Sequence, residues 1–129
     1  MMYSALVKRI DPLIEEAVTI EIRDTEFTGF ASVCPYKIKA GKSYPVLIGF
    51  TILDDLKICE TSEDKKIERI ASSFEHRITG VLYEDTIDAG VAFTDEDEYF
   101  SDYTELVGKN VTIKVDRISI EFLKTPPPL

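Results

Sequence analysis

Apolar and polar residues alternate along much of the first half of the chain, and this period of two predicts antiparallel strands. The segment 18–22 alternates strictly, and the segment 27–33 can return beside it after a polar turn at 24–26. A second turn at 40–43 precedes the longest apolar run, 44–53. Since this run is apolar on both faces, we expect a central strand that is covered on both sides.

Two further elements are predicted near the amino terminus. Residues 3–10 are a weaker strand candidate. Asp11 and Pro12 follow as a suitable N-cap and first helical position, so we expect a short helical turn that runs to Glu16.

The period of the pattern changes in the segment 61–74. Its apolar side chains recur at the spacing that places them on one stripe of a helix: Ile67, Ile70, Ala71 and Phe74. Thr61 or Ser62 can cap this helix, and the acidic residues near its start suit the positive end of the helix dipole. We therefore predict the only long helix of the protein here.

The last part of the chain indicates strands at 77–83 and 90–93, followed by a longer strand whose pattern reverses. Apolar residues occupy odd positions from 111 to 115 and even positions from 118 to 122. Because side chains on a strand alternate strictly between two faces, a straight strand would expose half of this apolar set. We predict a bulge or sharp bend at Asp116-Arg117, as in strands that turn a corner of a small barrel.

Taken together, the order is three strands, one helix, and two or three strands. This order matches a five-stranded oligonucleotide/oligosaccharide-binding (OB) barrel in element order and strand bending, so we predict a mainly β, OB-like antiparallel barrel of bent strands. The alternative is an antiparallel β-sandwich with one covering helix. We expect a single β-rich domain over residues 1–124 and a flexible proline-rich tail over 125–129.

The charge of the chain is concentrated in one stretch. Fifteen Lys and Arg stand against twenty-four Asp and Glu, for a net charge of −9. Residues 78–108 hold nine acids and no base, and the fifteen acids outside that stretch balance the fifteen bases. Since nucleic-acid affinity comes largely from cationic contacts, this balance disfavours DNA or RNA as a partner.

Within the acidic stretch, aromatic residues are interleaved with carboxylates. Tyrosine offers contact area at low entropic cost, so such a loop can bind a protein, and its negative charge favours a basic partner. The competing interpretation is a solvated loop whose aromatic residues pack onto the fold. The candidate partner-binding residues are Asp95, Glu96, Asp97, Glu98, Tyr99, Asp102 and Tyr103.

A second candidate surface combines tyrosines with the chain's small lysine cluster. On a barrel face, this combination can bind single-stranded nucleic acid by stacking, or an oligosaccharide. Its residues are Tyr36, Lys37, Lys39, Lys42 and Tyr44.

Catalytic and metal-binding patterns are mostly absent from the sequence. His76 is the only histidine, and its apolar neighbours favour a buried, hydrogen-bonded imidazole over a catalytic base. Cys34 and Cys59 have no CxxC spacing, so we expect reduced, partly buried thiols. The segment 40–43 lacks the first glycine of a phosphate loop, and the acids at 95–98 do not fit a calcium loop. We expect no cofactor and no metal.

The sequence thus favours a non-catalytic binding or adaptor module that engages a basic protein through its acidic loop, in an inhibitor-like or immunity-like role. The alternatives are the OB-like ligand-binding barrel and a small enzyme that uses His76 or a carboxylate pair. No apolar run is long enough to cross a bilayer, and charged residues interrupt the amino-terminal segment, so we expect no signal peptide and a cytoplasmic location. The oligomeric state stays open, since a second copy could cover the apolar strand 44–53 in a homodimer.

Overall fold

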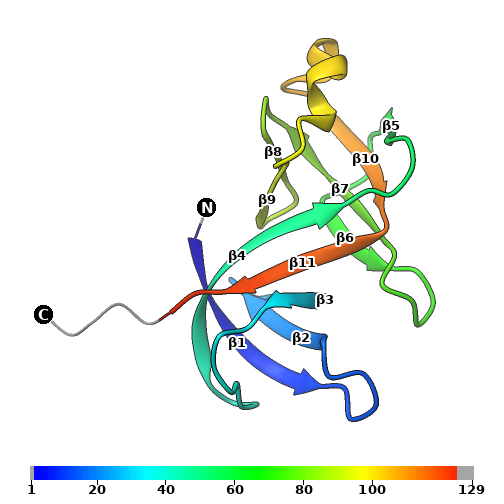
Figure 1. Cartoon of the computed structure of the whole chain (residues 1–129). Coiled ribbons are helices and arrows are strands. Elements are labelled where there is room, and N and C mark those ends of the chain that lie inside the picture. Colours follow the sequence, from blue (N-terminus) through cyan, green and yellow to red (C-terminus); the bar gives the residue numbers. More distant parts are fainter. Residues whose placement is uncertain (1, 125–129) are drawn as a thin grey trace, which may run out of the picture.

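The computed structural model describes residues 2–124, and five of its strands close a ring (Figure 1). Around the ring the order is β1, β2, β3, β11 and β4, and β4 pairs back with β1. Neighbours in the ring are antiparallel except β3 and β11, which run parallel. The ring strands are β1 (Met2–Ile10), β2 (Ala17–Ile22), β3 (Thr25–Val33), β4 (Ser43–Thr51) and β11 (Arg117–Phe122).

The remaining elements lie between β4 and β11 in sequence and form a second group of strands, above the ring in Figure 1. From β4 the sheet continues through β9, β8, β7 and β10 to β5, and β6 pairs with β7. One 3-10 helix, η1, precedes β10. The bounds are β5 (Lys57–Glu60), β6 (Lys66–Arg69), β7 (His76–Leu82), β8 (Thr86–Asp88), β9 (Ala92–Thr94), η1 (Tyr99–Leu106) and β10 (Asn110–Val115).

The mainly β fold and the small bent-strand barrel predicted from the sequence are confirmed. One apolar core joins the ring to the second group of strands, because buried residues of β1 and β11 belong to the same cluster as those of β7 and β10. The order of elements differs from the prediction: β5 and β6 follow β4 where the helix was expected, and six short strands in all are inserted before the last ring strand.

The predicted break at Asp116-Arg117 is confirmed, and it marks the passage from β10 to β11. The odd apolar residues of β10 and the even ones of β11 are all buried, so the bend keeps both sets in the core. Asp116 fixes this bend: its backbone N–H donates to the Thr51 carbonyl at 2.9 Å, and its Oδ2 accepts from the Leu53 N–H at 2.7 Å.

The predicted helix over 61–74 is wrong, since this segment contains β6 and the loop that joins it to β7. β6 pairs with β7 in register from Lys66–Thr79 to Arg69–His76. In the loop, the Ser73 hydroxyl donates to the Ile70 carbonyl and accepts from the Glu75 N–H. Serine side chains compete in this way with helical hydrogen bonds, and pairing with a distant strand outweighs the local helical period.

Two smaller predictions also need correction. The segment 11–16 is a hydrogen-bonded turn and not a helix, although Asp11 does cap it: its Oδ1 accepts from the N–H groups of Leu13 and Ile14 at 2.8 and 3.0 Å. The run 44–53 is not covered on both sides, because Leu47 is only half-buried and Leu53 is 77% exposed.

No helix within residues 2–124 has the length and apolar character needed to span a membrane. The predicted tail, 125–129, lies outside the described residues.

Candidate functional site

The acidic loop begins at Asp95, whose side chain is turned inward. Asp95 is 7% exposed, and its carboxylate accepts hydrogen bonds from the N–H groups of Phe100 at 2.8 Å and Asp97 at 3.3 Å. Its own N–H donates to the carbonyl of Asp85 at 2.8 Å, which holds the loop beside the turn between β7 and β8. Asp95 therefore shapes the loop and does not present its carboxylate to a partner.

Two aromatic residues of η1 anchor the loop to β4. The Tyr99 hydroxyl donates to the Ile52 carbonyl at 2.7 Å, and Phe100 is buried with its ring centroid 5.6 Å from that of Phe50. Burial raises the pKa of the Tyr99 hydroxyl, and the nearby carboxylates of Asp97 and Asp95 act in the same direction. The packing interpretation of these aromatic residues thus holds for Tyr99 and Phe100, while Tyr103 is half-buried on the same helix.

The other acids of the loop are exposed and carry unneutralised charge. No salt bridge within residues 2–124 involves any of them; the nearest base in sequence, Lys109, pairs with Glu60 at 3.5 Å. These free carboxylates are Glu96, Asp97, Glu98, Asp102 and Glu105.

Two of these acids border a groove of about 150 Å³ on the outer face of β4 and β11. Glu96 and Asp97 contribute from the loop, and Glu121 contributes from β11. The floor consists mainly of small or uncharged residues, among them Gly49, Thr51 and Ser119, and no basic residue lines it. We call this feature the acidic groove. It joins part of the predicted acidic site to a carboxylate that lies 24 positions further along the chain.

Sequence reasoning missed Glu121, although its position contained a usable signal. With Ile120 and Phe122 assigned to the core, Glu121 must point outward from the same strand. What the sequence did not reveal was the pairing of β11 with β4, which places Glu121 opposite Leu47 and beside the loop.

The tyrosines of the second candidate surface are used internally. The rings of Tyr36 and Tyr44 stack on each other, with centroids 5.5 Å apart. The Tyr36 hydroxyl donates to the Leu123 carbonyl at 2.6 Å, and the Tyr44 hydroxyl accepts from the Lys39 N–H at 2.9 Å. Lys37, Lys39 and Lys42 are exposed. The structure therefore brings Tyr36, Tyr44 and the backbone of Lys39 together, and the two aromatic rings pack against each other.

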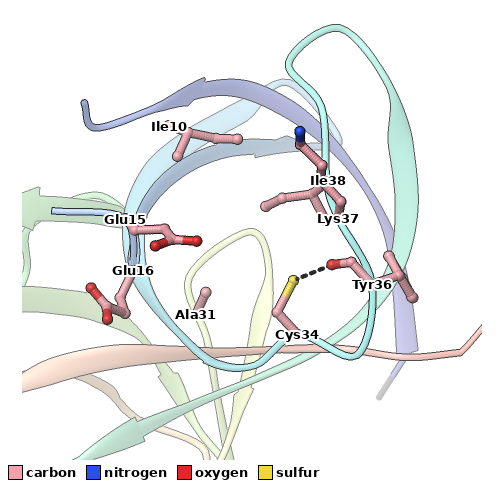
Figure 2. A pocket seen from close by; sticks show the side chains of 8 residues that line it. All are labelled: Ile10, Glu15, Glu16, Ala31, Cys34, Tyr36, Lys37 and Ile38. Carbon is pink, nitrogen blue, oxygen red and sulfur yellow. Dashed lines mark hydrogen bonds between the residues drawn. The ribbon is translucent and has the colours of Figure 1, made fainter. Parts of the chain in front are cut away.

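A larger cavity, of about 380 Å³, opens at the end of the ring where β1 and β3 finish (Figure 2). Two of the second surface's residues, Tyr36 and Lys37, line it, while Lys39, Lys42 and Tyr44 do not. No local pattern in the sequence indicates that the loop at 11–16 faces them. The full lining is Ile10, Glu15, Glu16, Ala31, Cys34, Tyr36, Lys37 and Ile38.

His76 is buried as expected, at 1% exposure, and lines none of these cavities. Its Nδ1 lies 2.7 Å from the Phe74 carbonyl oxygen; since a carbonyl only accepts, Nδ1 carries the proton. Burial lowers the pKa of the imidazole, and Arg69 lowers it further. The ring is thus a neutral core residue.

Both cysteines are free, but the prediction that they are partly buried is wrong, because both are exposed. The Cys34 thiol donates to the Tyr36 carbonyl at 3.0 Å, an interaction drawn in Figure 2. In the part of the chain that the structure describes, no three side chains of His, Cys, Asp or Glu converge as metal ligands would.

Comparison with known proteins places the chain in a family. No curated protein and no solved structure matches the chain. A family model described as "Uncharacterised conserved protein UCP019853" matches residues 1–123. Because the match covers nearly the whole length of 129 residues, the chain belongs to this family of uncharacterised conserved proteins.

Proposed function

We propose that the protein is a non-catalytic binding module that docks a lysine- or arginine-rich protein segment in the acidic groove. The observation that carries this proposal is the convergence of Glu96, Asp97 and Glu121 around a floor without any basic residue. Two separate parts of the chain supply these carboxylates.

Charge supports a basic partner over other ligands. Carboxylates without an internal partner attract cations over about one Debye length, roughly 8 Å at physiological salt, and they repel phosphate. Two exposed acids, Glu98 just before η1 and Asp102 within it, extend the negative field beyond the groove itself. Such a field mainly accelerates association and selects the sign of the partner's charge.

The anchoring of the loop supports a docking role for the same surface. Asp95 and Tyr99 fix the loop from inside, so the backbone that carries the free carboxylates is held in place before a partner arrives. Less conformational entropy is then lost on binding, which favours affinity. The floor residues Gly49 and Ser119 are small and leave room for the long stems of lysine or arginine side chains.

The test is the binding of a fluorescently labelled oligolysine peptide, followed by anisotropy over a series of salt concentrations. The groove variant is Glu96→Gln, Asp97→Asn and Glu121→Gln together. A matched control is Glu26→Gln, Asp54→Asn and Asp55→Asn, which removes the same charge from exposed acids outside the groove.

We expect the groove variant to weaken binding at least tenfold and to flatten its salt dependence, with a much smaller effect in the control. Equal losses of oligolysine affinity in the two variants would show a nonspecific effect of net charge and would refute binding in the acidic groove. The same pair of variants then serves to judge proteins captured from a lysate.

We also propose that the module acts in the cytoplasm. Two exposed free thiols, Cys34 and Cys59, suit a reducing compartment.

A further inference from the structure

The cavity at the end of the ring, which we call the barrel-mouth pocket, is formed by two loops. Glu15 and Glu16 come from the connection between β1 and β2, and Lys37 and Ile38 come from the connection between β3 and β4. In Figure 2 the two glutamates lie on one side of the opening and Lys37 on the opposite side; the Glu15 carboxylate points toward the opening, and the Glu16 carboxylate is turned away from it. Its volume of about 380 Å³ falls in the range of small-molecule sites.

Between these charges the lining is mostly apolar. Ile10 and Ala31 belong to β1 and β3, and together with Ile38 they are half-buried residues that pack against the core. The pocket therefore combines an apolar centre with a negative and a positive rim.

Both loops are held firmly, so the pocket does not depend on a ligand for its shape. On the glutamate side, the Glu16 carbonyl accepts from the Ala31 N–H at 2.8 Å, and Asp11 caps the turn. On the lysine side, Tyr36 is fixed by its hydrogen bond to the Leu123 carbonyl and by stacking on Tyr44.

The rim charges are not neutralised within the described part of the chain. No salt bridge among residues 2–124 uses Glu15, Glu16 or Lys37, although six other pairs form on the surface. With two glutamates on one side and one lysine on the other, the rim carries one net negative charge. This balance disfavours an oligonucleotide, whose phosphates would meet the glutamates.

We propose that the barrel-mouth pocket binds a small linear zwitterion, with its ammonium group at Glu15 and Glu16, its carboxylate at Lys37 and its methylene chain over Ile10, Ala31 and Ile38. An ω-amino acid or a short peptide with free ends has this chemistry. Each part of the ligand then meets a matching part of the lining. The inference does not depend on the proposed function, because the acidic groove shares no residue with this pocket.

Three probes of equal chain length separate the contributions of the two rims: ε-aminocaproic acid, hexylamine and hexanoate. Binding is measured by isothermal titration calorimetry and by changes in amide chemical shifts. We expect ε-aminocaproic acid to bind most tightly, hexylamine less tightly and hexanoate least, because the glutamates outnumber the lysine. Shifts should concentrate at residues 10–16 and 31–38.

Variants of each rim test the orientation. Lys37→Met should reduce the affinity for ε-aminocaproic acid about fivefold, to the level of hexylamine, because it removes an exposed ion pair with the carboxylate of the probe. The affinity for hexylamine, which has no carboxylate, should stay the same or increase slightly. The double variant Glu15→Gln with Glu16→Gln should weaken both ammonium-bearing probes. The matched control, Glu26→Gln with Asp54→Asn, removes the same charge from exposed acids that line neither the pocket nor the acidic groove, and it should bind all probes as the wild type does.

The proposal is overturned if none of the probes binds, if the three bind equally, or if the rim variants leave the order unchanged. Circular dichroism of each variant establishes that it is folded. If oligolysine binding fails while ε-aminocaproic acid binding follows the expected pattern, only the proposed docking function is lost.

Discussion

The carboxylate of Asp95 accepts a hydrogen bond from the backbone N–H of Phe100, across five positions of the acidic loop. Asp95 and Phe100 are both buried, so this contact ties the loop to the core and not to solvent. The exposed carboxylates of the loop owe their positions to it.

We expect Asp95→Ala to lower the free energy of unfolding by about 1–2 kcal/mol, because it leaves the N–H groups of Phe100 and Asp97 without their acceptor. Urea denaturation measures the change. The neighbouring Asp97→Ala removes an exposed carboxylate of the same charge and should stay within about 0.5 kcal/mol of the wild type. Similar losses in the two variants would contradict the structural role of Asp95.

Tyr99→Phe should cost about 1 kcal/mol of stability, since it removes the donor to the Ile52 carbonyl and keeps the ring in place. The control is Tyr103→Phe on the same helix, whose hydroxyl makes no hydrogen bond among the described side chains. Thermal unfolding followed by circular dichroism distinguishes them. If Tyr99→Phe is neutral for stability but weakens oligolysine binding, Tyr99 acts at the partner surface instead.

Gly80→Ala should destabilise the protein by about 3 kcal/mol or prevent folding, because β7 and β8 approach each other closely at this position. A Cβ on Gly80 would overlap the carbonyl oxygen of Asp88 and lie 2.6 Å from its carbonyl carbon. Gly49→Ala is the matched strand glycine, and its Cβ would lie 3.2 Å from the Thr94 carbonyl oxygen. For Gly49→Ala we expect a clearly smaller loss of stability, measured by chemical denaturation. A larger loss for Gly49→Ala than for Gly80→Ala would contradict this packing.

The stability of the protein should fall as the pH drops below about 6.5, and His76 is the cause. Burial lowers the pKa of His76 below the ordinary histidine value of about 6.5, so the unfolded state takes up a proton before the folded state does. The contribution of His76 to stability is therefore fully present above the pKa that the imidazole has in the unfolded state. It is lost as the pH falls toward the pKa of His76 in the folded state.

Melting temperatures between about pH 5 and pH 7.5 isolate this effect, because carboxylates titrate mainly below that range and His76 is the only histidine. The comparison variant is His76→Asn, which removes the titrating group. It should be less stable at neutral pH and should have a flatter profile. A wild-type profile as flat as that of the variant would contradict a buried neutral imidazole.

The sequence was most informative where one strand face is buried and the other is not. The reversal of parity at Asp116-Arg117 located the passage from β10 to β11, because an exposed apolar half-strand is too costly to leave uncorrected. The period of Ile67, Ile70 and Phe74 was misleading, since these residues lie on β6 and the loop that follows it. Short apolar runs are compatible with both periods, and only the distant partner, β7, decides between them.

The candidate sites show the same limit. Local sequence identified the acidic loop, but nothing near Glu96 reveals that Glu121 will lie across a groove from it. Likewise Glu15 and Lys37 face each other because two loops meet at one end of the ring, and a single sequence does not encode such a meeting in any local pattern.

The late position of β11 in the chain has a consequence for how the molecule reaches its native state. β11 pairs with both β3 and β4, yet it follows β4 by the whole length of the inserted strands. During synthesis the first four strands emerge with one gap between β3 and β4, and no residue before Arg117 fills it. Long-range pairing of this kind slows folding, so the nascent chain presents unpaired edges on β3 and β4 until β11 has been synthesised.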